Sequence, residues 1–87
     1  MNTVISREKV FSQVHRYLRD RILRGEYPPG ARLIETDIAA ELNVSRTPVR
    51  EALVLLQGQD LVATPDGGGF VIADPHQQLL DIVDIRV

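Results

Sequence analysis

The chain has 87 residues, 44% hydrophobic and 25% charged, which suits one small globular domain with a modest core. It has no cysteine, no signal-peptide pattern and no apolar run near the roughly 20 residues that cross a bilayer, so we expect a cytoplasmic protein without disulfides, thiolate metal sites or membrane contact. The net charge is −2, but residues 1–50 hold nine Lys and Arg against six acids, a net +3 that permits one basic face.

The first expected element is a long helix over residues 7–24. Its apolar residues follow the i, i+3/i+4 spacing of one helical face: Val10, Phe11, Val14, Leu18 and Ile22. Gly25 is a natural C-terminal stop. Arg16 and Arg19 then lie on the opposite side, in solvent or against a phosphate backbone.

Two shorter helices are expected next, with a tight turn between them. The first covers residues 36–42, and Thr36 is placed as its N-cap. Asn43 tolerates the left-handed backbone that ends a helix, and Ser45 then caps a helix that continues to about residue 59. Two short helices joined in this way form a helix-turn-helix.

Beyond the third helix the sequence predicts a β-hairpin. Residues 61–64 and 70–72 have strand character, and the loop Pro65-Asp66-Gly67-Gly68-Gly69 between them is a flexible tip. Residues 32–34 can add a short extended piece. Three helices and a hairpin make a winged helix-turn-helix, a mainly α fold with a small β-hairpin, over residues 1–74. Residues 75–87 are interpreted as a linker and the truncated first helix of a further domain.

One face of the third helix is typical of nucleic-acid contact. A helical wheel places Arg46 and Arg50 opposite the apolar side, near the N-terminus that enters the major groove in recognition helices. Arginine there can bond guanine O6 and N7 or a phosphate, and the Ser45 and Thr47 hydroxyls can bond phosphate oxygens. Arg46 could reach Asn43 or Asp37 across the turn, but no acidic residue lies three or four positions from either arginine within the helix. We therefore interpret both as unpaired and favour an external anion as their partner.

Two classes of function stay open at this point. One is sequence-specific DNA binding, and the other is a winged helix for protein–protein contact in which Arg46 and Arg50 meet acidic residues of a partner. The glycine-rich loop matches neither common phosphate-binding pattern. No nucleophile–base set or carboxylate dyad indicates catalysis, so we predict a binding module and not an enzyme.

Several segments resemble the GntR family of bacterial regulators, most closely its FadR-type subfamily. The resembling segments within residues 7–74 are Gly25–Leu33, Glu35, Ile38-Ala39, Val44–Leu53 and Gly69–Ile72. The resemblance implies a transcription regulator, usually a repressor, that binds a palindromic double-stranded operator as a homodimer. It also implies that a small-molecule effector, sometimes with a metal, binds a missing all-helical C-terminal domain. No cofactor is expected in this chain itself.

The resemblance also assigns DNA contacts by position, including the wing tip at the minor groove. These implied contacts are Ser45, Arg46, Thr47, Arg50, Thr36, Gly68 and Gly69. The chain departs from the family pattern at Thr36, where arginine is frequent, and at Asp60, where glycine is usual. The wing carries Asp66 and no basic residue, so its phosphate contacts would come from the backbone. We therefore expect more of the specificity to reside at the start of the third helix.

Overall fold

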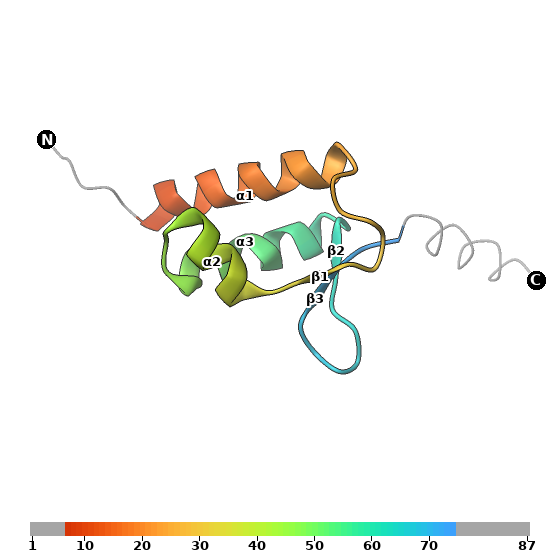
Figure 1. Ribbon diagram of the computed structural model, residues 1–87. Coiled ribbons are helices and arrows are strands. Elements are labelled where there is room, and N and C mark those ends of the chain that lie inside the picture. The colour runs from red at the N-terminus through yellow and green to blue at the C-terminus, as the bar shows by residue number, and fades with distance from the viewer. Residues whose placement is uncertain (1–6, 75–87) are drawn as a thin grey trace, which may run out of the picture.

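Three helices and three short strands make up the computed structural model, which describes residues 7–74 (Figure 1). The helices are α1 (Arg7–Leu23), α2 (Glu35–Leu42) and α3 (Arg46–Gly58). The strands are β1 (Arg32–Leu33), β2 (Val62–Ala63) and β3 (Phe70–Ile72). The predicted winged helix-turn-helix is confirmed, and the predicted linker and further helix at residues 75–87 lie outside the described residues.

The wing is part of a three-stranded antiparallel sheet in the order β1-β3-β2. Val71 of β3 lies opposite Arg32 on one side and opposite Ala63 on the other. The extended piece predicted before α2 is therefore a true strand, paired with the wing. The loop between β2 and β3 projects away from the helices (Figure 1).

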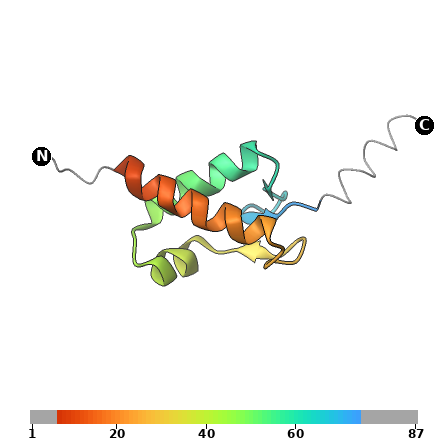
Figure 2. The same ribbon diagram turned by 90° about the horizontal axis from the view of Figure 1, so that it is seen from above.

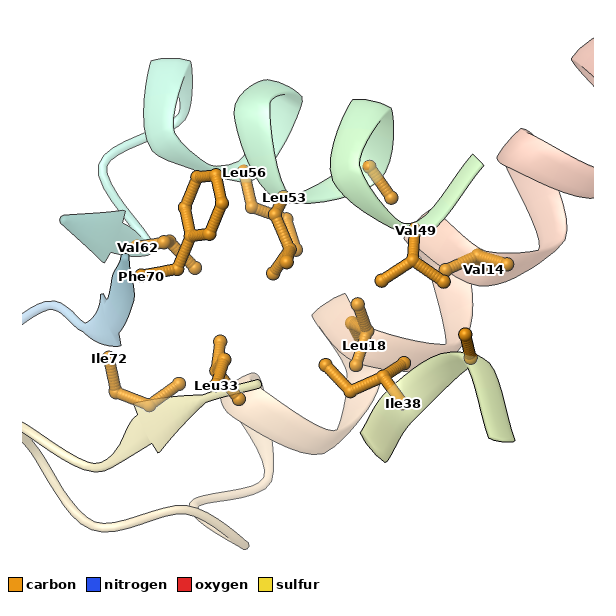
Figure 3. Packing of buried hydrophobic residues seen from close by; sticks show 12 residues of the cluster. Val14, Leu18, Leu33, Ile38, Val49, Leu53, Leu56, Val62, Phe70 and Ile72 are labelled. Atoms are coloured by element: carbon orange, nitrogen blue, oxygen red, sulfur yellow. The ribbon is translucent and has the colours of Figure 1, made fainter. Parts of the chain in front are cut away.

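The core lies where α1, α3 and the sheet meet (Figure 3). Its buried residues are Val14 and Leu18 of α1; Ile38 and Ala39 of α2; Val49, Ala52, Leu53 and Leu56 of α3; and Leu33, Val62, Phe70 and Ile72 of the sheet. Seen from above, α1 lies across the middle of the molecule, with α3 on one side and α2 on the other (Figure 2). The predicted apolar stripe of α1 is confirmed at its centre, whereas Val10, Phe11 and Ile22 are half-buried at the rim of the core.

The turn of the helix-turn-helix depends on Asn43, which has φ 57° and ψ 47°. This left-handed backbone is the one predicted for Asn43, and it lets the amide of Val44 donate to the Ala39 carbonyl at 3.0 Å. Asp60 takes the same conformation (φ 65°) at the end of α3. Asparagine and aspartate thus occupy the two positions where glycine is the common choice.

The predicted cap of α2 is wrong. The helix begins at Glu35, with Ile34 in the cap position, and Thr36 lies exposed in the first turn. The cause is that β1 leads almost directly into α2, and the Ile38 amide closes the first turn on the Ile34 carbonyl at 3.0 Å. Ser45 does occupy the N-cap position of α3, although its hydroxyl forms no capping hydrogen bond within the described residues.

Candidate nucleic-acid interface

An open hollow of about 270 Å³ lies between β1, the start of α2, the start of α3 and the end of the wing loop. We call it the arginine hollow. It is lined by Arg32, Leu33, Ile34, Glu35, Thr36, Arg46, Arg50, Gly69 and Phe70. Three of these side chains are cationic and one is anionic, so the hollow has an excess of positive charge.

Arg46 and Arg50 both face Glu35 of α2, which corrects the prediction that they are unpaired. Arg50 Nε lies 3.3 Å from Glu35 Oε2, and Arg46 Nη2 lies 3.9 Å from Glu35 Oε1. Within α3 itself, no acidic residue lies three or four positions from either arginine, as the sequence indicates. The carboxylate comes from the neighbouring helix, because the helix-turn-helix places the first turn of α2 beside the first turn of α3.

The three charged groups differ in their exposure to solvent. The Glu35 side chain is 16% exposed, whereas those of Arg46 and Arg50 are 67% and 66% exposed. One carboxylate cannot neutralise two guanidiniums, and each guanidinium has five N–H donors. Exposed ion pairs of this kind contribute about 0–1 kcal/mol to stability. The main effect of Glu35 is therefore to hold both arginines in place while most of their donors face outward.

The structure brings most of the predicted contact residues to one surface. Thr36 and Gly69 line the arginine hollow, and Thr47 lines a second depression that it shares with Glu35, Arg46 and Arg50. The remaining two lie nearby in the chain but outside these linings. They are Ser45, exposed at the start of α3, and Gly68, half-buried in the wing loop with φ 91°.

Two charged residues of the hollow escaped the sequence prediction of contacts, Arg32 and Glu35. Arg32 is exposed and its neighbour Leu33 is buried, which is the alternation of a strand with one face on the core. A strand of two residues is too short for that alternation to be recognised. Glu35 escaped because its partners belong to another helix, although an acid in the first turn of α2 is visible in the sequence.

A second charged cluster lies at the other end of α2, around Arg21 of α1. We call it the Arg21 cluster, and its members are Tyr17, Arg21, Glu26, Tyr27 and Glu41. The Arg21 guanidinium carbon lies 5.2 Å from the centre of the Tyr17 ring and 4.9 Å from that of Tyr27. Its Nε donates to Glu26 at 3.0 Å and its Nη1 to Glu41 at 3.2 Å. These contacts join Arg21 to the turn after α1 and to α2, so its side chain is not simply exposed to solvent on the surface of α1.

The proton affinities within the Arg21 cluster follow from these contacts. Hydrogen bonds from Arg24 and then Arg21 lower the pKa of Glu26, so this carboxylate keeps its charge in mildly acidic solution. The Tyr17 hydroxyl donates to Glu41 at 2.8 Å, and this hydrogen bond raises the pKa of Tyr17. The cluster is thus a set of satisfied charges, in which each ionic group meets at least one partner.

Residues 7–74 show neither a metal-binding cluster nor a membrane span. No group of three or more His, Asp or Glu side chains in this range is arranged to hold a metal ion. Within the same residues we find no helix with the length and hydrophobicity to cross a bilayer.

The sequence matches the family model of bacterial regulatory proteins named gntR over residues 11–72. The chain is 39% identical over 75 residues to the Uxu operon transcriptional regulator of Escherichia coli (strain K12). The matched segment covers 85% of this chain and 29% of that protein. The chain is 40% identical over 70 residues to the gluconate operon transcriptional repressor of Bacillus subtilis (strain 168), with coverages of 80% and 29%. The chain therefore spans less than a third of the length of these relatives.

Solved structures show the same fold. A transcriptional regulator described as a GntR family member, from Pseudomonas syringae pv. tomato str. DC3000, superimposes with a TM-score of 0.72 at 33% identity, over 84% of this chain and 31% of that one. A GntR protein of Streptococcus agalactiae gives a TM-score of 0.64 at 34% identity, over 74% and 31%. The family match over residues 11–72 includes α2, α3, the sheet and all the residues that line the arginine hollow.

Proposed function

The chain belongs to the GntR family of bacterial regulatory proteins, and we propose that it is the DNA-binding module of a transcription regulator. The observation that carries the proposal is the arginine hollow. Arg46 and Arg50 stand at the start of α3, share one carboxylate and expose about two thirds of their side chains. A polyanion with hydrogen-bond acceptors at regular spacing fits this surface.

We propose that α3 enters the major groove by its first turns. Arg46 and Arg50 would then bond a guanine edge or a phosphate, because their guanidiniums already point outward from Glu35. Ser45 and Thr47 are exposed beside them and can donate hydroxyl groups to phosphate oxygens. Thr36 at the start of α2 can contribute one further hydroxyl.

The wing loop is proposed to approach the minor groove. Gly68 and Gly69 have φ of 91° and 80°, which allows a tight loop, and the Gly68 amide closes this loop by donating to the Pro65 carbonyl at 2.8 Å. Since the loop has Asp66 and no basic side chain, we assign its role to backbone contacts. The wing would therefore position the domain on DNA more than it distinguishes sequences.

For the whole protein we propose a metabolite-responsive repressor of the FadR type. It would bind a palindromic operator in the cytoplasm as a homodimer and leave it when an effector binds a separate all-helical domain. One relative is named a repressor of the gluconate operon, and both quoted relatives are more than three times as long as the matched segment.

The test is the salt dependence of DNA binding, measured by fluorescence anisotropy with a duplex selected from a random pool and with a scrambled duplex. Each phosphate neutralised should add about −0.9 to the slope of log K against log[salt]. The selected duplex should also resist competition by non-specific DNA. Affinity that is flat in salt and insensitive to competitor DNA would overturn the proposal and favour a winged helix that binds an acidic protein partner.

A further inference from the structure

We propose that Arg32 of β1 is an additional DNA-contacting residue that binds a backbone phosphate between the wing and α3. We also infer that the Arg32 guanidinium occupies the space that a side chain at Gly69 would fill, while the φ of 80° at Gly69 by itself favours glycine. The inference rests on the proposed DNA-binding function and assigns it a residue outside the helix-turn-helix.

The sheet fixes the direction in which Arg32 points. Leu33 packs in the core and Arg32 lies opposite Val71 of β3, so the Arg32 side chain emerges on the outer face. The amides of Gly30 and Ile72 extend the pairing, with bonds of 2.9 Å between Gly30 N and Ile72 O and 2.8 Å between Ile72 N and Ala31 O. The position of Arg32 is thus as firmly set as that of the wing strand itself.

The side chain of Arg32 reaches the end of the wing loop. A Cβ atom built on Gly69 would lie 2.8 Å from Arg32 Nη1, closer than real Cβ atoms lie to other atoms. The guanidinium therefore lies directly against the Gly69 backbone, at the edge of the arginine hollow. A phosphate that faces the wing amides from this side would also face Arg32.

The charge distribution of the hollow favours an anion at this point. Glu35 is the single carboxylate in its lining, and it is paired with Arg46 and Arg50. Among residues 7–74 no carboxylate forms an ion pair with Arg32. The wing has no cationic side chain of its own, so Arg32 supplies the positive charge that the loop lacks.

The test compares Arg32→Ala with Arg24→Ala in the 87-residue chain. Arg24 is an equally charged, exposed control at the end of α1, paired with Glu26 at 2.9 Å. Loss of one phosphate contact should reduce the salt slope by about 0.9, so the ratio of affinities at about 50 and about 200 mM salt should shrink about 3.5-fold. Arg32→Ala should do this equally for selected and scrambled duplexes, Arg32→Lys should restore most of the slope, and Arg24→Ala should leave it unchanged.

If the unmodified chain is salt-dependent and Arg32→Ala keeps its slope, this inference fails while the proposed function stands. If the unmodified chain itself shows no salt dependence, the proposed function fails, and this inference with it. The two failures are therefore distinguishable within one titration series.

A double-mutant cycle with Gly69→Ala tests the second half of the inference. The added methyl should displace the Arg32 guanidinium and weaken binding several-fold, but it should weaken binding much less when Arg32 is already alanine. Backbone strain at φ 80° is common to both backgrounds and cancels in the comparison. Additive effects of the two substitutions would overturn the assignment of the Gly69 space to Arg32.

Discussion

The Arg21 cluster and the arginine hollow contain the same kinds of charged side chain in different proportions. In the Arg21 cluster one arginine meets two carboxylates and two tyrosine rings, and its side chain is only 25% exposed. The arginine hollow is lined by three arginines and one carboxylate, which pairs only with Arg46 and Arg50, and these two side chains are about two thirds exposed. The two regions lie at opposite ends of the short helix α2, which contributes Glu41 to the first and Glu35 to the second.

This difference separates a charge that stabilises the fold from a charge that is available for binding. Arg21 has two carboxylate partners and two tyrosine rings around it, so it connects α1, the following turn and α2, and its charge is already compensated. An arginine that shares one carboxylate with another keeps free donors in a fixed direction. The number of arginines in the sequence does not reveal this difference. The number of charged and aromatic partners around each arginine in the structure does.

The largest expected effect is the loss of DNA affinity when Arg50 or Arg46 becomes alanine. Each change should cost about 1–3 kcal/mol of binding and relax the preference at one base position if the contact is to a base edge. The thermal midpoint should change little because the exposed pair with Glu35 contributes little stability. Electrophoretic shift titrations and thermal melts of the same samples measure both. Intact operator binding by both folded variants would contradict the site assignment.

The converse change is Arg21→Ala, for which stability should fall and binding should persist. Two cation–π contacts and the bonds to Glu26 and Glu41 are lost, and we expect about 1–2 kcal/mol of destabilisation. Urea unfolding followed by circular dichroism measures this loss.

Arg21→Lys is the matched variant for this position, and it should recover only part of the stability because an ammonium lacks the planar stacking group. Below the melting transition, the DNA affinity of both variants should equal that of the unmodified chain. A loss of affinity in Arg21→Ala with unchanged stability would mean that the two regions are not separate in function.

The smallest expected effect concerns Glu35→Gln, which removes the shared carboxylate charge but keeps the shape. Non-specific DNA binding should become tighter, because the hollow gains positive charge. The ratio of specific to non-specific affinity should fall several-fold, because Arg46 and Arg50 lose the group that orients them. Competition titrations with selected and scrambled duplexes give this ratio.

Asp37→Asn is the control for Glu35→Gln, because Asp37 is an exposed acid in the same first turn of α2. It removes the same charge and should leave the ratio of affinities unchanged. If both variants behave alike, the orienting role of Glu35 is refuted.

Much of the fold could be predicted because its signals are local. The helical spacing around Val14 and Leu18, the left-handed residue Asn43 and the strand character of residues 70–72 each act over a few positions. The N-cap of α2 was misplaced at Thr36 because the entry into that helix depends on strand pairing of β1, which overrides the capping preference of a single side chain. Local preference and tertiary structure disagree only at this helix start.

The candidate site could be predicted only in part, for a related reason. The outward direction of Arg46 and Arg50 follows from helix geometry, so a wheel finds it. Their pairing with Glu35 and the contact of Arg32 with Gly69 depend on how separate elements pack. Neither contact leaves a repeating pattern in the sequence, because each is a single contact between two separate segments of the chain.

The order β1-β3-β2 has a mechanical consequence for the interface. The three strands share the hydrogen bonds of one central strand, and the amides of Ile72 and Ala73 are anchored to Ala31 and Leu61 on its two sides. A displacement of β3 would therefore also displace the strand that carries Arg32 and the segment that follows α3. A slip of one residue in this ladder would exchange the outward and inward positions of Arg32 and Leu33. The sheet therefore fixes the relative positions of the wing, the start of α2 and the end of α3.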